Sequence, residues 1–473
     1  MFFGVWVPSS PTSQDFENYI SRMHLVQRQV DEIIESLKLA VQLNRTLHNV
    51  SVAKVPGQID VKLFQDPRES PSYKHFNYKL AISSIPDDVR DDIRSRGIKA
   101  VESYINAFRK LKNYIINEYM PNTRKSYGVM EWDPTDNYYR ACLRWHLSLN
   151  ITPEEVHDIG LKEVERISGN MSEIVKKLGF SGSVKGFFKS LLNDSRFYSN
   201  DSEHILQLVK KIVFERIEPK LSSYFKDIPK VPLSVQKSGV DDLTASYKSA
   251  SKDEPGILFI NLFRPLEVST FALMPICLHE AIPGHHLQHI YTMNASLPEF
   301  RKKSILLFYN IPNWFPFYSA FQEGWGLYSE YLGEEMGLYE NDYEMMGRYS
   351  FEILRAARMV VDTGIHYYGW SRDKAIEYMT NYTNLGPGTI TNEIDRYITW
   401  PGQAPAYKIG EIKIKELRKK AEERLGPAFD IREFHYVVLE NAKIPLSVLE
   451  TLVNRWIKKK CLKKHHTRRI NLF

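Results

Sequence analysis

One octapeptide constrains the fold more than any other part of this sequence: HEAIPGHH, residues 279–286. A histidine followed directly by a glutamate, with more imidazoles nearby, is typical of a catalytic zinc site, where imidazoles bind the ion and the carboxylate takes a proton from water. The usual spacing is His-Glu-x-x-His, which places both histidines on one face of a helix. Here Pro283 occupies the position of the second histidine. The octapeptide therefore cannot bind one ion as an unbroken helix.

The later histidines are out of reach on an ideal helix. His285 would lie about 120° round the helix from His279, and His286 about 10 Å further along it. Proline removes an amide donor and clashes with the carbonyl of His279, while Gly284 frees the backbone that follows. We therefore expect the helix to widen or loop out between the ligands, as helices with bulges do at functional sites.

We interpret the octapeptide as an expanded His-Glu-x-x-His motif with two inserted residues. His279 and His285 are the expected imidazole ligands of one Zn²⁺ ion, and Glu280 is the expected general base. Three alternatives stay open. His286 could replace His285 as ligand, His285 and His289 could form a separate pair because they are four residues apart, or all the imidazoles could be surface or hydrogen-bonded core residues without a metal.

Further motifs accompany the octapeptide. The string HEAIPGHHLQ is followed by FQEGWGLYSEYLGEEMGLY, VVDTGIHYYGWS, EIDRYITWPGQAPAYKIG and LGPAFDIREFHYVVLENAKIPL. Together they resemble domain-of-unknown-function family 885, from about residue 10 to about residue 450. That family is grouped with the zincin metallopeptidases and is similar in plan to the carboxypeptidase Taq, thimet oligopeptidase and angiotensin-converting enzyme families. Its members usually carry a further N-terminal segment, part of which this chain is expected to lack.

The resemblance implies a mainly α, two-lobed helical zincin-like metallopeptidase fold with a small β element beside the metal helix. A catalytic zinc also needs a third protein ligand and keeps one position open. The resemblance places this ligand at Glu323 in the EGW string, on a following helix, while an ordinary exposed helix carboxylate is the alternative. Glu330 on the same segment is a candidate hydrogen-bond partner for a ligand imidazole.

A short apolar run at residues 256–262 predicts a strand ahead of the metal helix. In zincins an edge strand in this position pairs with an extended peptide, which satisfies backbone groups of the substrate. Asn261 in this run could orient a substrate carbonyl. A turn or cap role is the alternative for this asparagine.

Polar residues downstream are candidates for contacts with the substrate. Amide hydrolysis develops an oxyanion that needs donors beyond the metal, and Tyr407 and His366 are our candidates. Arg396 and Lys408 could bind a substrate carboxylate, in which case the enzyme would trim peptide ends. Hydrogen-bonded core positions and structural ion pairs are the competing interpretations of these four residues.

Composition suits one large enzyme domain: 473 residues, 43% of them hydrophobic and 12% aromatic. We expect a helical N-terminal lobe over residues 1–240, a metal-bearing catalytic lobe over 241–450 and a basic tail over 451–473. The net charge is +6, but the tail alone carries eight lysines and arginines with no acid, so the remainder sums to −2. Basicity therefore belongs to the tail, and we infer no nucleic-acid partner.

Helix starts can be recognised in the first half. Apolar residues from Phe16 to Leu37 recur at helical spacing after Thr12, which can cap the helix. A second helix is expected from the Pro86 region to about residue 118. Thr152 followed by Pro153 predicts the start of a third, which reaches about Leu178.

Compartment signals point in two directions. The start of the sequence lacks the features of a signal peptide, no run approaches the length of a membrane helix, and three cysteines cannot form a disulfide framework. Eight Asn-x-Ser/Thr sequons hint at a secreted or surface protein with a missing N-terminus. These sequons begin at Asn44, Asn49, Asn150, Asn170, Asn193, Asn200, Asn294 and Asn381.

The sequence therefore predicts a zinc-dependent peptidase that acts on peptides through a water activated by zinc and Glu280. A zinc amidase that acts on a small non-peptide amide is an alternative, since the same ligands would serve it. A catalytically silent binding protein on the peptidase scaffold is another. A serine nucleophile finds no support, because the sequence has no Gly-x-Ser-x-Gly elbow. Nothing in the sequence indicates an oligomeric state.

Overall fold

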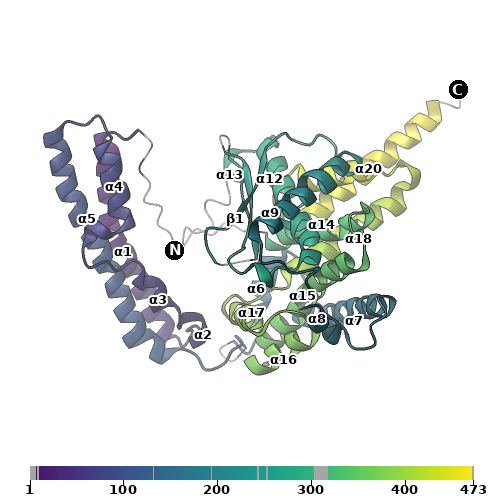
Figure 1. The fold of residues 1–473 in the computed structure, drawn as a ribbon, viewed down its shortest axis with the longest axis horizontal. Coiled ribbons are helices and arrows are strands. Elements are labelled where there is room, and N and C mark those ends of the chain that lie inside the picture. Colours follow the sequence, from purple (N-terminus) through teal and green to yellow (C-terminus); the bar gives the residue numbers. More distant parts are fainter. Residues whose placement is uncertain are drawn as a thin grey trace. The chain divides into compact units, whose positions relative to one another are not determined.

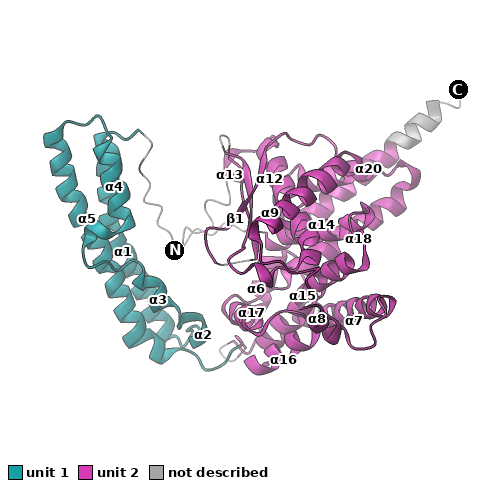
Figure 2. Ribbon diagram, viewed as in Figure 1, with its two compact units in different colours: residues 1–127 teal, residues 128–473 magenta. Residues whose placement is uncertain are grey.

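The structure, a computed structural model, describes residues 7, 10–130, 133–192, 194–241, 244–251, 254–302 and 318–470, the last eight of these by their backbone alone. The sequon residue Asn193 and the chain start at residues 1–6 lie outside this range. The protein is mainly helical with one small sheet, and it divides into two compact units, residues 1–127 and 128–473 (Figures 1 and 2). The lobe boundary expected at residue 240 falls inside the second unit.

Unit 1 is built on two long helices that pack along each other (Figure 1). Its helices are α1 (Ser13–Gln42), α2 (Asn49–Val52), α3 (Val55–Asp60), α4 (Pro71–Ala81) and α5 (Asp87–Tyr114). The predicted start of α1 is confirmed: the Thr12 side chain accepts a hydrogen bond from the Asp15 amide, and the Asp15 carboxylate accepts one from the Thr12 amide. The apolar stripe of α1 is buried against α4 and α5 in a core that belongs to this unit.

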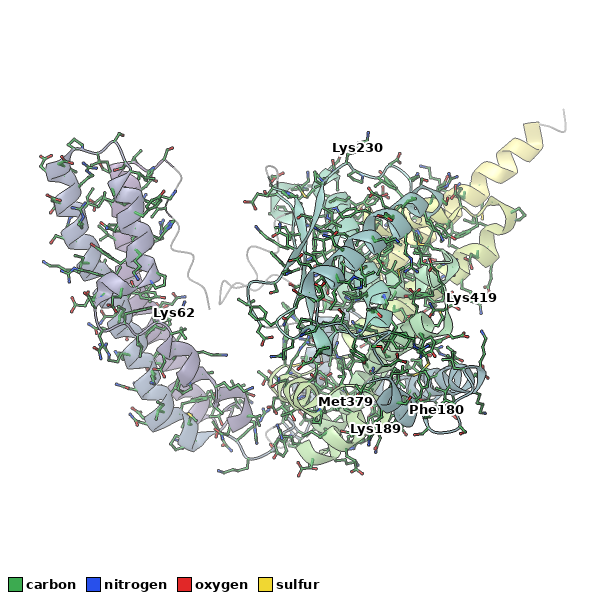
Figure 3. All side chains as sticks on the ribbon, viewed as in Figure 1. Lys62, Phe180, Lys189, Lys230, Met379 and Lys419 are labelled. Carbon is green, nitrogen blue, oxygen red and sulfur yellow. The ribbon has the colours of Figure 1, made fainter. Side chains whose placement is uncertain are left out.

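Unit 2 holds the remaining helices. They are α6 (Asn137–Leu147), α7 (Pro153–Lys177), α8 (Val184–Leu191), α9 (Ser202–Lys211), α10 (Leu221–Tyr224), α11 (Leu273–Glu280), α12 (His285–Asn294), α13 (Glu299–Lys302), α14 (Ser319–Glu335), α15 (Asp342–His366), α16 (Arg372–Tyr382), α17 (Pro387–Thr399), α18 (Ala406–Leu425), α19 (Ile431–Leu439) and α20 (Leu446–Ile470). Side chains fill the space between these helices (Figure 3). The predicted start of α7 is confirmed by a capping box between Thr152 and Glu155.

The sheet of unit 2 has three short strands in the order β1-β3-β2, which are Leu233–Lys237, Gly256–Ile260 and Ala245–Lys248. Strand β1 pairs parallel and β2 antiparallel with β3. The strand expected from the apolar run is thus present, but it is the middle strand and not an edge. Its two partners are more polar and carry a weaker strand signal, so the apolar pattern predicted the strand but not its neighbours, and the edge position came only from the comparison with zincins.

Helices α14 and α18 cross at very short distance because two glycines face each other (Figure 1). At Gly324 and Gly410 a Cβ atom would overlap the backbone of the opposite helix. The crossing lies one residue from Glu323 and one turn from Tyr407. It therefore fixes the spacing of the two helices that carry Glu323 and Tyr407.

A search of the described helices finds no segment whose length and apolar character would suit a membrane span. The C-terminal helix α20 carries the basic tail and packs on α18 and α19 through its first half, where Leu449, Val453 and Ile457 are buried.

Candidate metal centre

The octapeptide folds as two helices joined by a turn. Helix α11 ends at Glu280, and α12 begins at His285. The intervening turn is held by Trp325, whose indole nitrogen donates a hydrogen bond of 2.9 Å to the carbonyl of Pro283. The predicted interruption of the helix is confirmed. It turns His285 back toward His279, so that their rings lie 4.9 Å apart at nearly a right angle.

His279, His285 and Glu323 form a group that could hold a metal ion, with one ligand atom of each within 4.8 Å of the others. Oε2 of Glu323 lies 3.5 Å from Nε2 of His279 and 3.5 Å from Nε2 of His285. This spacing is long for a hydrogen bond. It matches the separation of about 3.3 Å expected for two ligand atoms on one tetrahedral zinc ion with bonds of about 2.0–2.1 Å.

Glu330 holds the first imidazole from its other side. Nδ1 of His279 lies 2.7 Å from Oε1 of Glu330, which leaves Nε2 to face Glu323. The hydrogen bond expected between Glu330 and a ligand imidazole is thus confirmed. Arg355 on α15 places Nη2 3.6 Å from the same carboxylate oxygen. Both Glu330 and Arg355 are buried.

Gly326 makes room for the ligand imidazole. A Cβ atom at this position would lie 2.7 Å from Nε2 of His279. Gly326 is three residues after Glu323 and therefore on the adjoining turn of the same helix face. The EGWG string thus supplies a candidate ligand, one glycine of the helix crossing, the hydrogen bond from Trp325 to the turn and the space for His279.

The electrostatics of the group favour a cation. Burial alone would lower the pKa of His279, but the contacts with Glu323 and Glu330 outweigh it and raise the pKa to about 10. Burial would raise the pKa of Glu323, but its contacts with the two imidazoles hold it well below its usual range. Carboxylates that stabilise an extra proton in a buried place also stabilise a divalent ion there. The three side chains are only 6%, 11% and 13% exposed, so water screens this charge weakly.

Glu280 has the environment of a general base. Burial raises its pKa, and nearby Glu323 adds to the shift, while His285 and His279 oppose it. A carboxylate with a raised pKa is a stronger proton acceptor than an ordinary one.

The neighbouring histidines have other partners. His286 is buried, with Nδ1 3.0 Å from the Tyr247 hydroxyl and Nε2 3.3 Å from the carbonyl of Val231. Nε2 of His289 lies 3.0 Å from the carbonyl of Ala250. Burial lowers the pKa of His286 to about 4, so it stays neutral. The geometry therefore favours His285 as the second ligand.

Tyr407 is connected to Glu330 through Arg355. Its ring is covered by Arg355 and Arg358 at 5.9 and 4.7 Å from the ring centroid, and its hydroxyl accepts a hydrogen bond of 3.3 Å from Arg396. Arg355 also contacts Glu330, so Tyr407 and Arg396 are linked to the metal group by a short series of contacts.

Lys408 is placed differently from its predicted role. Its ammonium group is 1% exposed and lies 2.7, 2.5 and 3.0 Å from carboxylates of Glu352, Glu411 and Glu163. An ammonium group has three N–H donors, and these carboxylates occupy them. Lys408 is therefore part of a buried ionic cluster and cannot bind a substrate carboxylate.

His366 and Asn261 also occupy structural positions. His366 is fully buried, with Nε2 2.8 Å from the carbonyl of Tyr397 and its ring against Tyr139. The side-chain amide of Asn261 donates to Asp241, and its oxygen accepts a hydrogen bond from the amide of Phe263. These contacts fit the alternative interpretations of the two residues, a hydrogen-bonded core position for His366 and a turn position for Asn261.

The family model described as "Bacterial protein of unknown function (DUF885)" matches residues 7–453. The chain belongs to the DUF885 family. The family resemblance drawn from the motifs is therefore confirmed. A search of curated proteins finds no match for this DUF885 member.

Two solved structures resemble this DUF885 chain. A protein from Colwellia psychrerythraea, described as a candidate lipoprotein, is 31% identical, with a TM-score of 0.83 over 95% of this chain and 77% of that chain. A protein from Shewanella oneidensis, described as a candidate lipoprotein of unknown function, is 18% identical, with a TM-score of 0.67 over 93% of this chain and 78% of that chain. The second likeness concerns the fold alone.

Sequence reasoning missed two residues beside this DUF885 site. Arg355, which contacts Glu330, and Arg358, which covers the ring of Tyr407, lie on the buried α15 within an otherwise apolar stretch. Charged residues in such a stretch need buried partners, and this was a signal that the sequence contained. The sequence offered no such signal for the contact between Trp325 and Pro283.

Proposed function

We propose that this protein is a zinc-dependent hydrolase that cleaves amide bonds of peptides. The observation that carries the proposal is the position of Glu323 Oε2, which lies 3.5 Å from a nitrogen of each imidazole, next to a glutamate with a raised pKa. Two histidines and one glutamate are a ligand set of catalytic zinc. A structural zinc site would present four protein ligands, but this group has three among the described residues.

His279, His285 and Glu323 would hold the ion, which supplies a lowered pKa for water and polarisation of a carbonyl group. Glu280 accepts a proton from the attacking water. The water oxygen forms a bond to the carbonyl carbon, the carbon–nitrogen bond breaks, and Glu280 delivers the proton to the leaving amine. This cycle returns Glu280 to its starting state and consumes one water for each bond.

We assign Tyr407 as the donor to the oxyanion that develops on the substrate. Its hydroxyl is oriented by Arg396, and guanidinium groups cover its ring. A hydrogen-bond donor fixed in advance stabilises such charge without reorganisation. His366, Asn261 and Lys408 take no part, since their side chains have structural partners.

We further propose that unit 2 is a zincin-like fold and that the protein works outside the cytosol. Helix α11 carries His279 and the later helix α14 carries Glu323, and this order of ligand-bearing helices supports the zincin-like fold. The description of the Colwellia relative as a candidate lipoprotein supports the location outside the cytosol. Cell fractionation with an antibody to this chain tests the location, and recovery in the cytosol alone would contradict it.

Elemental analysis combined with a peptide-library digest tests the function. We expect about one zinc per chain and cleaved peptides in the wild type. Glu280→Gln should keep zinc and lose at least about a hundredfold in rate. Glu423→Gln, an exposed carboxylate on α18, is the matched control and should behave as wild type. Full turnover by Glu280→Gln would refute the mechanism.

The two alternatives give different results in the same experiment. A zinc amidase would bind the metal, leave every peptide intact and hydrolyse acylated amines in a parallel panel. A silent binding protein would need no stoichiometric zinc and would hydrolyse neither panel.

A further inference from the structure

Three arginines gather beside the metal group with too few carboxylates to balance them. Arg358 and Arg396 share the carboxylate of Glu393, and Arg355 contacts only that of Glu330. Glu330 is already bound to the ligand imidazole of His279. In the ion pairs of the described residues this arginine cluster, defined as Arg355, Arg358 and Arg396, therefore has one positive charge in excess.

Arg396 is the most exposed member of this cluster and so the one that an anion from solvent can reach. The side chains of Arg355 and Arg358 are 9% and 7% exposed, whereas that of Arg396 is 31% exposed. Arg396 lies 3.4 Å from its one carboxylate partner, and its shorter contacts are to neutral oxygens, 2.9 Å to Gln403 and 3.3 Å to Tyr407. Its Nε has no partner among the described residues. Arg396 can therefore accept an anion without breaking a strong ion pair.

Arg396 is also placed for a role in substrate binding. It bonds the hydroxyl of Tyr407, the residue that we assign to the oxyanion, and Arg355 links this tyrosine to Glu330 and His279. An anion bound at Arg396 would lie next to the Tyr407 hydroxyl.

We propose that Arg396 binds the C-terminal carboxylate of the substrate, so that the enzyme removes residues from the carboxyl ends of peptides. This inference rests on the proposed hydrolase function. A guanidinium group recognises a carboxylate through two parallel hydrogen bonds, and a terminal carboxamide cannot replace that charge. A purely structural Arg396, which only ties α17 to the turn before α18, would show no preference for a free carboxylate.

Pairs of N-acetylated peptides with identical sequence test this, one ending in a carboxylate and one in a carboxamide. We expect the wild type to favour the acid by roughly 10- to 100-fold in kcat/KM, the range of charge-assisted hydrogen bonds. Arg396→Gln should lose most of this preference. Because Arg396 also orients Tyr407, the rate on the amide should fall as well, but by a smaller factor than the rate on the acid. Arg396→Lys should keep part of the preference. Arg372→Gln is the matched control. Arg372, on α16, forms an ion pair with Asp395, the neighbour of Arg396 on α17, so this variant also removes an arginine that contacts α17.

Binding provides a readout that does not depend on turnover. Zinc-loaded Glu280→Gln, titrated calorimetrically with both peptides of a pair, should bind the acid more tightly, and the double variant with Arg396→Gln should not. Equal affinity for acid and amide, or no binding of either peptide, would overturn the inference. So would an Arg396→Gln variant that slows both substrates equally while keeping zinc and helix content.

The two proposals fail in different ways. A wild type that cleaves acids and amides equally well would retain the hydrolase function and lose the carboxylate site. A wild type that binds acids selectively but cleaves no peptide would retain the carboxylate site and lose the hydrolase function.

Discussion

Oε1 of Glu330 lies 2.7 Å from Nδ1 of His279, on the side of the imidazole opposite the proposed metal. The carboxylate accepts a hydrogen bond from Nδ1–H, and this tautomer leaves the lone pair of Nε2 free for an ion. Glu323 and Glu330 are seven residues apart, so they share one face of α14 and bind the two nitrogens of one ring. A single helix therefore supplies both a ligand and the group that orients a ligand.

Glu330→Gln should weaken zinc binding by about 10- to 100-fold, because the amide still accepts the hydrogen bond but no longer increases the basicity of the imidazole. Competition with a chromophoric chelator measures the affinity. Glu334→Gln on the same helix, where the carboxylate is 46% exposed, should leave it unchanged. An unaltered affinity in Glu330→Gln would show that the contact does not support the metal.

His285→Ala and His286→Ala should separate metal binding from stability. His285→Ala removes a ligand, so we expect loss of stoichiometric zinc in elemental analysis. His286→Ala removes one of the two hydrogen-bond partners of the Tyr247 hydroxyl and creates a cavity, so it should lower the melting temperature while zinc is retained. Loss of zinc from His286→Ala alone would reverse the ligand assignment.

Lys408→Met should destabilise the protein and leave substrate affinity unchanged. Removal of the ammonium group leaves three buried carboxylates without their shared partner, which costs about 3–5 kcal/mol in comparable buried pairs. Urea denaturation followed by circular dichroism measures the loss. A rise in KM with full stability would instead restore Lys408 as a substrate contact.

Asp362 should make stability depend on pH. Burial raises the pKa of Asp362 to about 7, although hydrogen bonds from Tyr139 and the Gly402 amide lower it. The folded pKa lies above the unfolded value of 3.8, so the folded state holds this proton more tightly. The contribution of Asp362 to stability is therefore greatest below about pH 4, falls by about 1.4 kcal/mol per pH unit as pH rises toward 7, and is constant above that.

Asp362→Asn removes this titration and keeps an oxygen that can accept both hydrogen bonds. Between pH 4 and 7 the free energy of unfolding of the wild type should fall, relative to that of this variant, by about 1.4 kcal/mol per pH unit. Identical slopes in the two proteins would place the pKa of Asp362 outside this range.

The local features of the fold were predictable because they depend on short-range chemistry. The caps at Thr12 and Thr152, the helical stripe of α1 and the interruption at Pro283 follow from residues within a few positions of one another. The expected ligands His279, His285 and Glu323 also meet in one group, as the motif spacing and the family resemblance predicted.

Tertiary packing alone decided the rest. Lys408 and Arg396 have the same charge and lie in the same motif, yet the side chain of Lys408 is buried among three carboxylates and that of Arg396 is 31% exposed. Strand β3 is apolar whether it lies in the middle or at the edge of the sheet, and only its pairing partners determine which. The residue types set what each side chain can do chemically. Which partners it meets depends on contacts between segments up to hundreds of residues apart, whose geometry no local pattern encodes.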